Sequence, residues 1–384
     1  MKKYILFSML LAGAAPAAAA MDSDDAYVDS VCRQFDLNEV VVTGTRTPKF
    51  LKDTPIQTRV INAKELARLD ATNVQDLLQQ ELPGVEFSYA MNQQTHLNFS
   101  GFGGQGVLFL VDGERLAGET MDDVDFTRLN MDNVERIEIV KGAASALYGS
   151  NATGGVINII TKRNRQPWTL NVNARYAKHN EQRYGASWGL NSKHWNNMLS
   201  AHFNRMDNYD VHSAANPVTR IISTVYGDKT VNLKEQLTWS PASNFSLTGR
   251  AGYFFRETVR SADLPERYRD FSGGLRMNWQ ISDADDLQAS YAFDQYDKSD
   301  YQRITRLDIR DYSNVQNSFR LLYNHTFGGG DVLTMGSDLL HDYLYNTNLE
   351  GETRKQDSWD LFAQYDWRLN DQWELVGALR YDYF

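Results

Sequence analysis

The stretch Val134–Lys162, VERIEIVKGAASALYGSNATGGVINIITK, is the most informative part of this chain. Apolar and polar side chains alternate at its start, β-branched residues fill its end, and small residues with glycines lie between. The pattern predicts a strand, a short helix and a second strand at Val134–Val140, Ala143–Tyr148 and Val156–Thr161. Glycines at 142, 149, 154 and 155 predict the tight bends that join them.

The first twenty residues predict a secretory signal peptide. Lys2 and Lys3 supply the positive start, and Tyr4–Ala14 is a short apolar run. Small residues at Ala17–Ala20 suit cleavage before Met21. The alternative is a membrane anchor, but a bilayer-spanning helix needs ~20 apolar residues and this run is shorter. Because no other run is long and apolar enough, a membrane role must come from strands.

Composition narrows the class further. The net charge of −10 does not favour a nucleic-acid surface. Cys32 is the single cysteine, so no intrachain disulfide forms. The chain carries 20 Tyr, 18 Phe and 8 Trp in an otherwise polar sequence. A barrel, whose strands are apolar on one face only, fits that combination.

From Pro167 onward the chain repeats a period-two alternation with one apolar and one polar face. Apolar faces of this kind occur in the ranges 168–176, 231–239, 245–255, 275–281, 287–293, 319–327, 361–367 and 373–383. Short connections at 191–193, 240–244, 282–286, 328–330 and 370–371 alternate with long ones at 207–229, 256–270, 297–313 and 346–356. A soluble β-sandwich would alternate too, but a membrane barrel better explains the length asymmetry and the aromatic load.

Val134–Lys162 closely resembles the end of the plug domain of TonB-dependent outer-membrane receptors. Several upstream pieces are similar to the same plug: a strand at Thr58–Asn62, two helices before Pro83-Gly84, and a strand at Val107–Val111 followed by the turn Asp112-Gly113. The resemblance implies an α+β plug domain followed by a transmembrane antiparallel β-barrel. It divides the chain into a signal peptide (1–20), a periplasmic segment (21–48), the plug (49–163) and barrel strands (164–384).

The barrel of this family has 22 strands, and we count about eleven here. A barrel of half that number is too narrow for a plug of this size. The last residues, Gly377–Phe384, are similar to a mid-barrel strand of the family, with Asp382 where an aromatic residue is usual. We therefore expect a partial barrel in a truncated chain, because an open edge in lipid leaves backbone groups unpaired.

Ahead of the plug, the β-branched run Glu39–Thr43 (Glu39, Val40, Val41, Val42, Thr43) follows a polar lead. Such a run is able to add to the edge of a partner's sheet. It resembles the TonB box, which pairs with the periplasmic protein TonB. The alternative is an ordinary first strand of the plug, and the position just before the plug favours the box.

The range 101–106 satisfies G-x-G-x-x-G, a dinucleotide-binding pattern when it opens a helix. Here it precedes the strand Val107–Val111, so we expect the glycines to allow tight backbone bends instead. The family usually has Arg before the first glycine, where this chain has Ser100.

Arg136, Glu138 and Lys141 lie where the family places charges that pair with barrel carboxylates. We therefore expect plug–barrel contacts from these three residues, because buried charges are normally paired. The alternative is a set of solvated charges on one face of the strand.

The resemblance places ligand contacts on the plug apex and the outer loops. The apex candidates are Tyr89, Met91, Gln94, His96, Asp122 and Asp123. Loop residues Tyr209, Arg260, Tyr268 and Arg303 are further candidates. His96 is the histidine nearest the apex. It is a candidate axial ligand of haem, and the alternative is an ordinary polar loop residue.

The implied function is active uptake of a scarce, bulky solute across the outer membrane, most simply an iron complex such as a ferric siderophore or haem. A cobalamin receptor and a non-functional fragment are the alternatives. No catalytic residues, metal ligands or cofactor are expected, although the transported ligand carries iron, haem or cobalt. The implied partners are TonB with its inner-membrane motor, outer-membrane lipid and a small-molecule chelate. A surface lipoprotein is a further candidate partner, and nucleic acid is not expected.

Two other classes of outer-membrane protein fit the sequence less well. A large glycan importer of the same superfamily usually has an extra domain before the plug, for which residues 21–37 leave no room. An adhesin or passive porin would lack the plug and the box.

Overall fold

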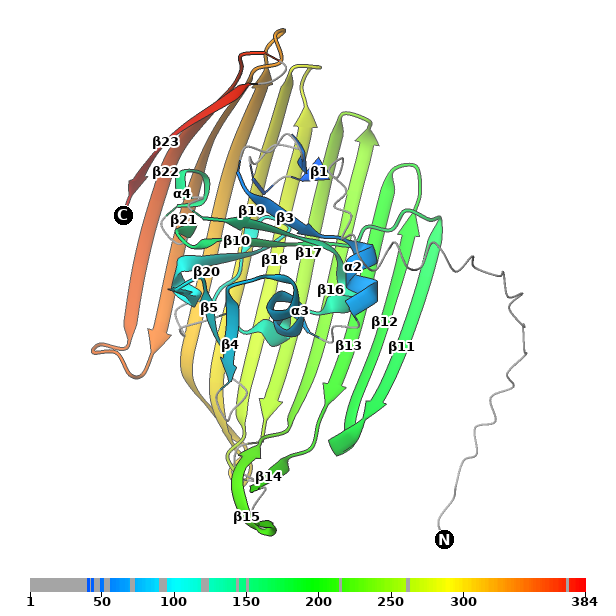
Figure 1. Ribbon diagram of the computed structural model, residues 1–384, viewed down its shortest axis with the longest axis vertical. Helices are drawn as coiled ribbons and strands as arrows, with labels where there is room; N and C mark the ends of the chain where they lie inside the picture. Colours follow the sequence, from blue (N-terminus) through cyan, green and yellow to red (C-terminus); the bar gives the residue numbers. More distant parts are fainter. Residues whose placement is uncertain are drawn as a thin grey trace, which may run out of the picture.

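A computed structural model describes residues 40–41, 43–44, 49–51, 56–69, 73–89, 95–118, 124–142, 145–149, 152–213, 216–259, 263–370 and 373–384. The predicted signal peptide and most of the segment 21–48 lie outside these ranges. The described part consists of a small α+β domain on the concave side of a large curved antiparallel sheet (Figure 1).

The small domain, which we call the plug, contains a five-stranded and a three-stranded sheet. The five-stranded sheet has the order β3 (Thr58–Ile61), β9 (Val134–Lys141), β10 (Gly155–Thr161), β7 (Val107–Val111) and β8 (Glu114–Arg115). Its pair β10–β7 is parallel and the others are antiparallel. The three-stranded sheet contains β4 (Val85–Tyr89), β5 (Thr95–Phe99) and β6 (Phe102–Gly103). The short strands β1 (Val40–Val41) and β2 (Lys49–Phe50) pair separately.

The helices of the plug are α2 (Ala63–Leu69), α3 (Val74–Glu81) and α4 (Ser145–Tyr148). Asn73 caps the start of α3: its side chain accepts a hydrogen bond from Asp76 N at 2.7 Å. Leu77 and Leu78 of α3 are fully buried. The core also holds Phe126, whose ring meets Phe87 and Phe109 edge-on at centroid distances of 5.2 and 5.0 Å.

The predicted strand–helix–strand pattern of Val134–Lys162 is confirmed as β9, α4 and β10. Gly155 shows why glycine is needed at the second bend. Its φ is +148°, and a Cβ there would lie 2.5 Å from Val140 O. A side chain at this position would force β9 and β10 apart.

The glycine-rich range 101–106 leads through a 3₁₀ turn, Gly104–Gly106, directly into β7. An α-helix does not follow it. Gly101 has a φ of +90°, so the glycine serves a backbone bend, as the sequence predicted.

The large sheet contains eleven strands among the described residues. In spatial order they are β11 (Trp168–Ala177), β12 (Glu181–Asn191), β13 (Trp195–Arg205), β16 (Asp228–Ala242), β17 (Phe245–Thr258), β18 (Glu266–Gln280), β19 (Asp285–Gln302), β20 (Leu307–Thr326), β21 (Val332–Asn346), β22 (Thr353–Arg368) and β23 (Glu374–Tyr383). A hairpin of β14 (Tyr209–Ser213) and β15 (Asn216–Val225) projects beyond the strand ends.

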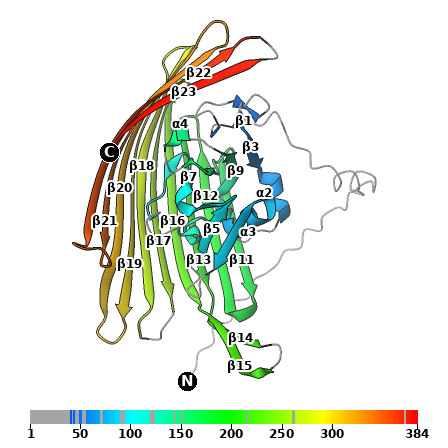
Figure 2. The ribbon, with the colours of Figure 1, turned by 60° about the vertical axis from the view of Figure 1, so that its left-hand side comes forward.

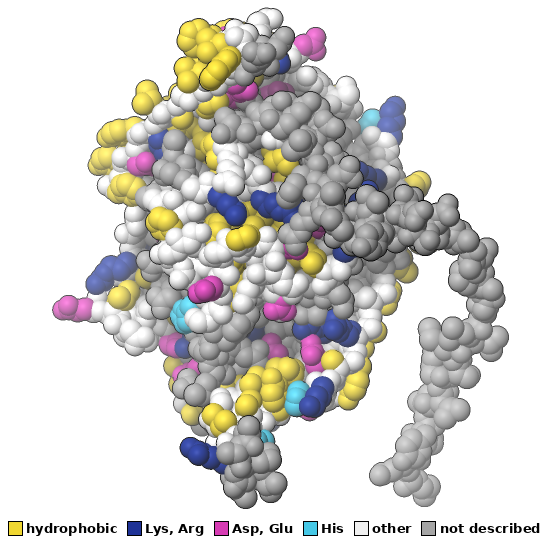
Figure 3. All heavy atoms as spheres, in the orientation of Figure 1, with side chains coloured by type: hydrophobic (Ala, Val, Ile, Leu, Met, Phe, Trp, Pro, Cys, Tyr) yellow, Lys and Arg dark blue, Asp and Glu magenta, His cyan; other side chains and the backbone are white. Residues whose placement is uncertain are grey.

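The convex face of the sheet is apolar and the concave face is polar. Trp168, Leu170, Val172 and Tyr176 of β11 are 58–72% exposed. Hydrophobic side chains likewise show along the outer margins of the molecule in Figure 3. Figure 2 shows the sheet curving around the plug, with α2 and α3 on the side away from β18–β20. The predicted period-two pattern is therefore confirmed, as part of a barrel.

The prediction of long connections was wrong at three places. The strands continue into all three ranges: β17 and β18 enter 256–270, β19 and β20 enter 297–313, and β21 and β22 enter 346–356, which leaves shorter connections than the sequence predicted. Tyr268, expected in a loop, lies in β18 and is 3% exposed. The range 207–229 is a long connection, but it folds into the hairpin β14–β15. At Arg256–Thr258 and Lys298–Asp300 polar residues occupy both faces of the strand, so the alternation pattern hid these strand ends while the backbone ladder continued.

Within the described residues, no helix has the length and apolar character that crossing a membrane requires.

Candidate functional site: the plug and its contacts

The segment Val40–Thr43 is held against the plug near Thr43. The backbone N–H of Thr43 donates to Glu138 Oε2 at 2.9 Å, and its hydroxyl donates to the same oxygen at 2.6 Å. Asn158 Nδ2 donates to Thr43 Oγ1 at 3.0 Å, and the Tyr148 hydroxyl donates to Thr43 O at 3.0 Å. Val41 is buried as well. Side chains of β9, β10 and α4 thus fix the end of this segment.

Of the residues predicted to face TonB, Glu39 and Val42 lie outside the described residues. The structure shows Val40 and Val41 in a two-residue strand with Lys49–Phe50. A pairing of this length adds little stability by itself, so among the described contacts the hydrogen bonds around Thr43 contribute most to docking.

Arg136 and Glu138 pair with each other within the plug. Arg136 Nη2 lies 2.8 Å from Glu138 Oε1, and the Glu138 side chain is fully buried. The described contacts of this pair lie in the plug, and Lys141 ends β9 half-buried. Their predicted contacts with barrel carboxylates therefore stay a prediction, while other plug residues carry the described ion pairs with the sheet.

The turn Asp112-Gly113, with φ of +52° and +84°, is held by three arginines of the large sheet. Arg250 of β17 lies 3.3 Å from Asp112 Oδ2. Arg276 of β18 lies 2.5 Å from Glu114 Oε1 and also donates to Asp112 O. Arg320 of β20 donates to Gly113 O at 2.8 Å. These contacts secure the β7–β8 hairpin to three strands of the large sheet, β17, β18 and β20.

Glu114 is ionised in this position. Burial raises the pKa of its carboxyl, but the positive charges of Arg276, Arg320 and Arg250 outweigh burial and lower the pKa to about 2. The carboxylate is thus matched to the surrounding arginines at neutral pH.

Arg128, at the end of a 3₁₀ turn (Phe126–Arg128), is the second connection between plug and sheet. Its Nη2 lies 3.0 Å from Asp270 Oδ1 and 2.8 Å from Asp294 Oδ2, and its Nη1 donates to Ala117 O at 2.7 Å. Ala117 N donates in turn to Asp294 Oδ2 at 2.7 Å. The cluster is almost wholly buried, so its charges depend on one another.

Asp125 forms a third connection, to β17 and β19. Arg256 Nη2 lies 3.1 Å from Asp125 Oδ2, and the Tyr296 hydroxyl donates to the same oxygen at 2.7 Å. Burial raises the pKa of Asp125, yet Arg256 and hydrogen bonds from Thr127 and Tyr296 bring it below its usual value. The Arg256 guanidinium also lies over the Tyr268 ring, 4.2 Å from its centroid.

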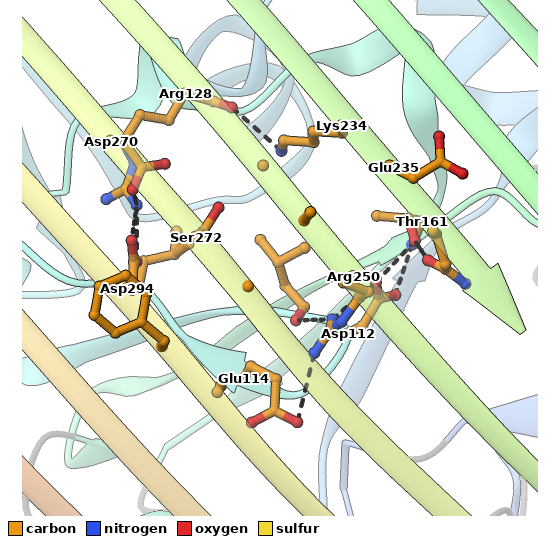
Figure 4. A pocket seen from close by; sticks show the side chains of 18 of the residues that line it. Asp112, Glu114, Arg128, Thr161, Lys234, Glu235, Arg250, Asp270, Ser272 and Asp294 are labelled. Carbon is orange, nitrogen blue, oxygen red and sulfur yellow. Dashed lines mark hydrogen bonds and ion pairs between the residues drawn. The ribbon is translucent and has the colours of Figure 1, made fainter.

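A small cavity of ≈110 Å³ lies between these connections. Figure 4 shows Glu114, Arg128 and Lys234 around it, with Asp270 and Asp294 at one side. Lys234 Nζ lies 3.4 Å from Arg128 O. The cavity is large enough to admit water, and its wall combines these charged groups with apolar side chains such as Leu116, Leu129 and Phe293.

A larger cavity of ≈770 Å³ lies between the plug and the strands β11–β13, bordered by the hairpin β14–β15 and the start of β16. Its walls combine polar and apolar groups. They include Thr95 and Thr127 of the plug and Arg175, Arg183, His202, Asn204, Tyr209 and Asp228 of the sheet and hairpin. A cavity of this size holds a solute of several hundred daltons.

Few of the predicted ligand contacts are described. Met91, Gln94, Asp122 and Asp123 lie outside the described residues, and Tyr89 ends β4. His96 lies on β5 opposite Ser88 and is exposed. Thr95, beside it, lines the larger cavity. Among the loop candidates, Tyr209 also lines this cavity, Arg260 is not described, and Arg303 pairs with Glu257 at 3.2 Å.

Sequence reasoning missed the residues that join plug and sheet: Asp112, Glu114, Asp125, Arg128, Arg250, Arg256, Arg276, Asp270, Asp294 and Arg320. A signal was present, since charged residues on the polar face of a strand that faces a protein interior need partners. The pairing itself needed the three-dimensional register. In the part of the chain that the structure describes, no group of three His, Cys, Asp or Glu side chains is placed to hold a metal ion.

Comparison with known proteins agrees with this architecture. The family described as "TonB-dependent Receptor Plug Domain" matches residues 51–156. A vitamin B12 transporter of Photobacterium profundum is 33% identical over 123 residues, 32% of this chain and 20% of the relative. A ferric aerobactin receptor of Klebsiella pneumoniae is 33% identical over 172 residues, 44% of this chain and 21% of the relative.

Among solved structures, the ferric enterobactin receptor of Pseudomonas aeruginosa superposes with a TM-score of 0.72 at 17% identity, covering 90% of this chain and 59% of that one. This chain therefore shares the fold of the solved structure. The part of the chain that matches the two curated relatives spans about a fifth of their length. We conclude that residues 51–156 are a plug domain of the TonB-dependent receptor type, and that the described residues after it form an eleven-stranded sheet with the fold of part of such a receptor's barrel.

Proposed function

We propose that this chain is the plug-bearing part of an outer-membrane receptor that imports a scarce, bulky chelate with energy delivered by TonB. One observation carries the proposal most directly. Among the residues that the structure describes, the segment before the plug is secured by hydrogen bonds around Thr43 and by a strand pairing of two residues. A partner that offers a sheet edge is able to replace such bonds with main-chain ones.

The larger cavity supports a ligand-binding role. It lies between the plug and the sheet, beside Thr95 near the plug apex. Its wall carries Arg175, Arg183, Arg205 and His202 together with the carboxylates Glu181 and Asp228, and Arg183 pairs with Glu181 at 2.7 Å. Cationic side chains and amide or hydroxyl groups suit an anionic or multiply oxygenated chelate. We therefore favour an iron complex, a ferric siderophore or haem, as the ligand. Cobalamin is the second candidate, because curated relatives at 33–37% identity are vitamin B12 transporters.

The role of Glu39–Thr43 is tested by deleting these five residues from the full-length receptor expressed in cells. Uptake of the labelled ligand should be abolished, while ligand binding at the cell surface should be retained. A deletion of equal length in the polar lead, residues 22–26, is the control and should leave uptake intact. Unchanged uptake after the first deletion would remove the TonB assignment.

The ligand is identified by titration calorimetry of the purified receptor with ferric siderophores, haem and cobalamin. Binding of one class with at least tenfold preference, about 1.4 kcal/mol, would assign it. Preference for cobalamin over every iron complex would overturn the favoured ligand and leave the receptor class in place.

A further inference from the structure

The side chain of Asn158 contacts the docked segment and the arginine-bound turn at the same time. Its Nδ2 donates to Thr43 Oγ1 at 3.0 Å, and its Oδ1 accepts from Gly113 N at 3.0 Å. Asn158 lies on β10, between β9 and β7, and is 2% exposed. One buried amide therefore spans the plug from the N-terminal segment to the β7–β8 turn.

At the turn, the Gly113 peptide groups connect Asn158 to the sheet. Gly113 N donates to Asn158, and Gly113 O accepts from Arg320 Nη1 at 2.8 Å. The positive φ values of Asp112 and Gly113 fix the shape of this two-residue turn. A displacement of the turn from Arg320 therefore moves the donor that holds the Asn158 carbonyl group.

At the other end, the Thr43 hydroxyl joins two hydrogen bonds. It accepts from Asn158 Nδ2 and donates to Glu138 Oε2 at 2.6 Å. Asn158 and Glu138 are directly opposite each other in the β9–β10 ladder. Hydrogen bonds in such a chain strengthen one another, so the loss of the Asn158 donor weakens the contact with Glu138 as well.

We propose that Asn158 is a positioning residue that couples the seating of the turn Asp112-Gly113 on the sheet to the docking of Val40–Thr43. Contacts between Arg320 and Gly113 keep the amide oriented toward Thr43; their loss lets the amide turn away and frees the segment. The biological meaning rests on the proposed function, since the freed segment is the one assigned to TonB. The coupling itself is a property of the receptor alone.

A spin label on the segment measures docking directly. Because Cys32 is the single cysteine of the chain, Cys32→Ser with Val40→Cys gives one labelling site. Electron paramagnetic resonance of the intact receptor in outer-membrane vesicles then reports the ratio of mobile to docked segment. Asn158→Leu should raise this ratio roughly two- to tenfold, as expected for the loss of a buried hydrogen bond. Arg320→Gln should raise it as well.

The decisive measurement is the double variant. If Arg320 acts on the segment through Asn158, Arg320→Gln should add no further rise in the Asn158→Leu background. An equal factor in both backgrounds, or an unchanged ratio in Asn158→Leu, would overturn the coupling. Arg310→Gln is the matched control, because Arg310 lies on the same strand, is half-exposed and pairs with Asp297. It should leave the ratio unchanged.

Thr43→Val covers the case in which Asn158→Leu fails to assemble. Valine keeps the shape of threonine but removes the hydroxyl that receives the Asn158 hydrogen bond. Arg320→Gln should then have no effect in the Thr43→Val background, and a full effect there would refute the proposal. If Arg320→Gln and Asn158→Leu change the ratio of mobile to docked segment independently, the coupling is refuted and the TonB role still stands. If uptake is unchanged after the Glu39–Thr43 deletion, the TonB role is refuted and the coupling still stands.

Discussion

The two sides of the plug differ in how they meet the sheet. Toward β17–β20, Asp112, Glu114, Asp125 and Arg128 form ion pairs with strand residues, most of them buried. Toward β11–β13, the plug borders the cavity of ≈770 Å³. One side is thus secured by specific charge pairs, and the other leaves space for a solute.

The difference shows which kind of contact suits a plug that must be both held and released. Buried ion pairs add little net stability over apolar packing, but they fix one register, because each charge left alone is costly. When water enters the interface, both members of a pair are hydrated again. Apolar clusters inside the plug, such as Phe87 with Phe126, keep the domain folded independently of those pairs.

The largest effect is expected from breaking the Arg128 cluster. Arg128→Met leaves Asp270 and Asp294 buried without their cation, so the free energy of unfolding of the plug should fall by about 3–5 kcal/mol. Urea titration of the purified receptor, followed by protease cleavage within the plug, measures this loss.

The matched control replaces the whole cluster. Arg128→Met combined with Asp270→Asn and Asp294→Asn removes the net buried charge and should recover most of the lost stability. If the single and triple variants were equally unstable, electrostatic pairing would not be what secures this side.

A smaller effect is expected from Glu114 and pH. Its pKa in the folded receptor, about 2, lies below the ordinary value of 4.5. The group therefore stabilises the docked plug fully above pH 4.5, and this contribution is lost as the pH falls toward 2. Glu114→Gln should be less stable than the parent at pH 7 and should lack this group's share of the acid-dependent loss. Urea midpoints at several pH values from 7 to 2 test both points; parallel pH curves would contradict the assignment.

Local patterns were sufficient to predict most of the plug and the large sheet. The Asn73 cap, the bends around α4 and the order of β9 and β10 follow from short-range chemistry. The strand ends at Arg256–Thr258 and Lys298–Asp300 did not follow, because side chains there are polar on both faces and only the backbone ladder continues the strands. Apolar and polar side chains alternate only where one face of a strand is buried or contacts lipid, so the pattern does not reveal a strand that has neither environment.

The contacts of the site were harder to predict. Glu138 was expected to contact the barrel, and that contact stays a prediction. The structure pairs Glu138 with Arg136 of the same strand and with Thr43, which lies eight residues before the residues that the plug family matches. Arg128 lies in no recognisable sequence motif. Its carboxylate partners, Asp270 and Asp294, lie 142 and 166 residues further along the chain. Partners at such separations are set by strand register, which one sequence without relatives does not reveal.

The smallest effect should come from the cavity side, where the same substitution is available on both sides of the plug. Asn314, fully buried on β20, accepts from Gly118 N at 2.8 Å and donates to Asp342 at 2.6 Å. Asn314→Ala should therefore cost about 1–3 kcal/mol of plug stability. Asn204 lines the large cavity on β13, and Asn204→Ala should change stability by no more than about 0.5 kcal/mol.

Ligand affinity should show the opposite order. Asn204→Ala removes a polar group from the wall of the cavity and should weaken ligand binding up to roughly tenfold, the range of one hydrogen bond. Asn314→Ala, on the ion-paired side, should leave intrinsic affinity nearly unchanged as long as the plug stays docked. Urea midpoints and titration calorimetry on the two variants separate these effects. Equal stability losses, or an affinity loss confined to Asn314→Ala, would show that the two sides do not divide holding from binding, because the cavity would then be only space between plug and wall.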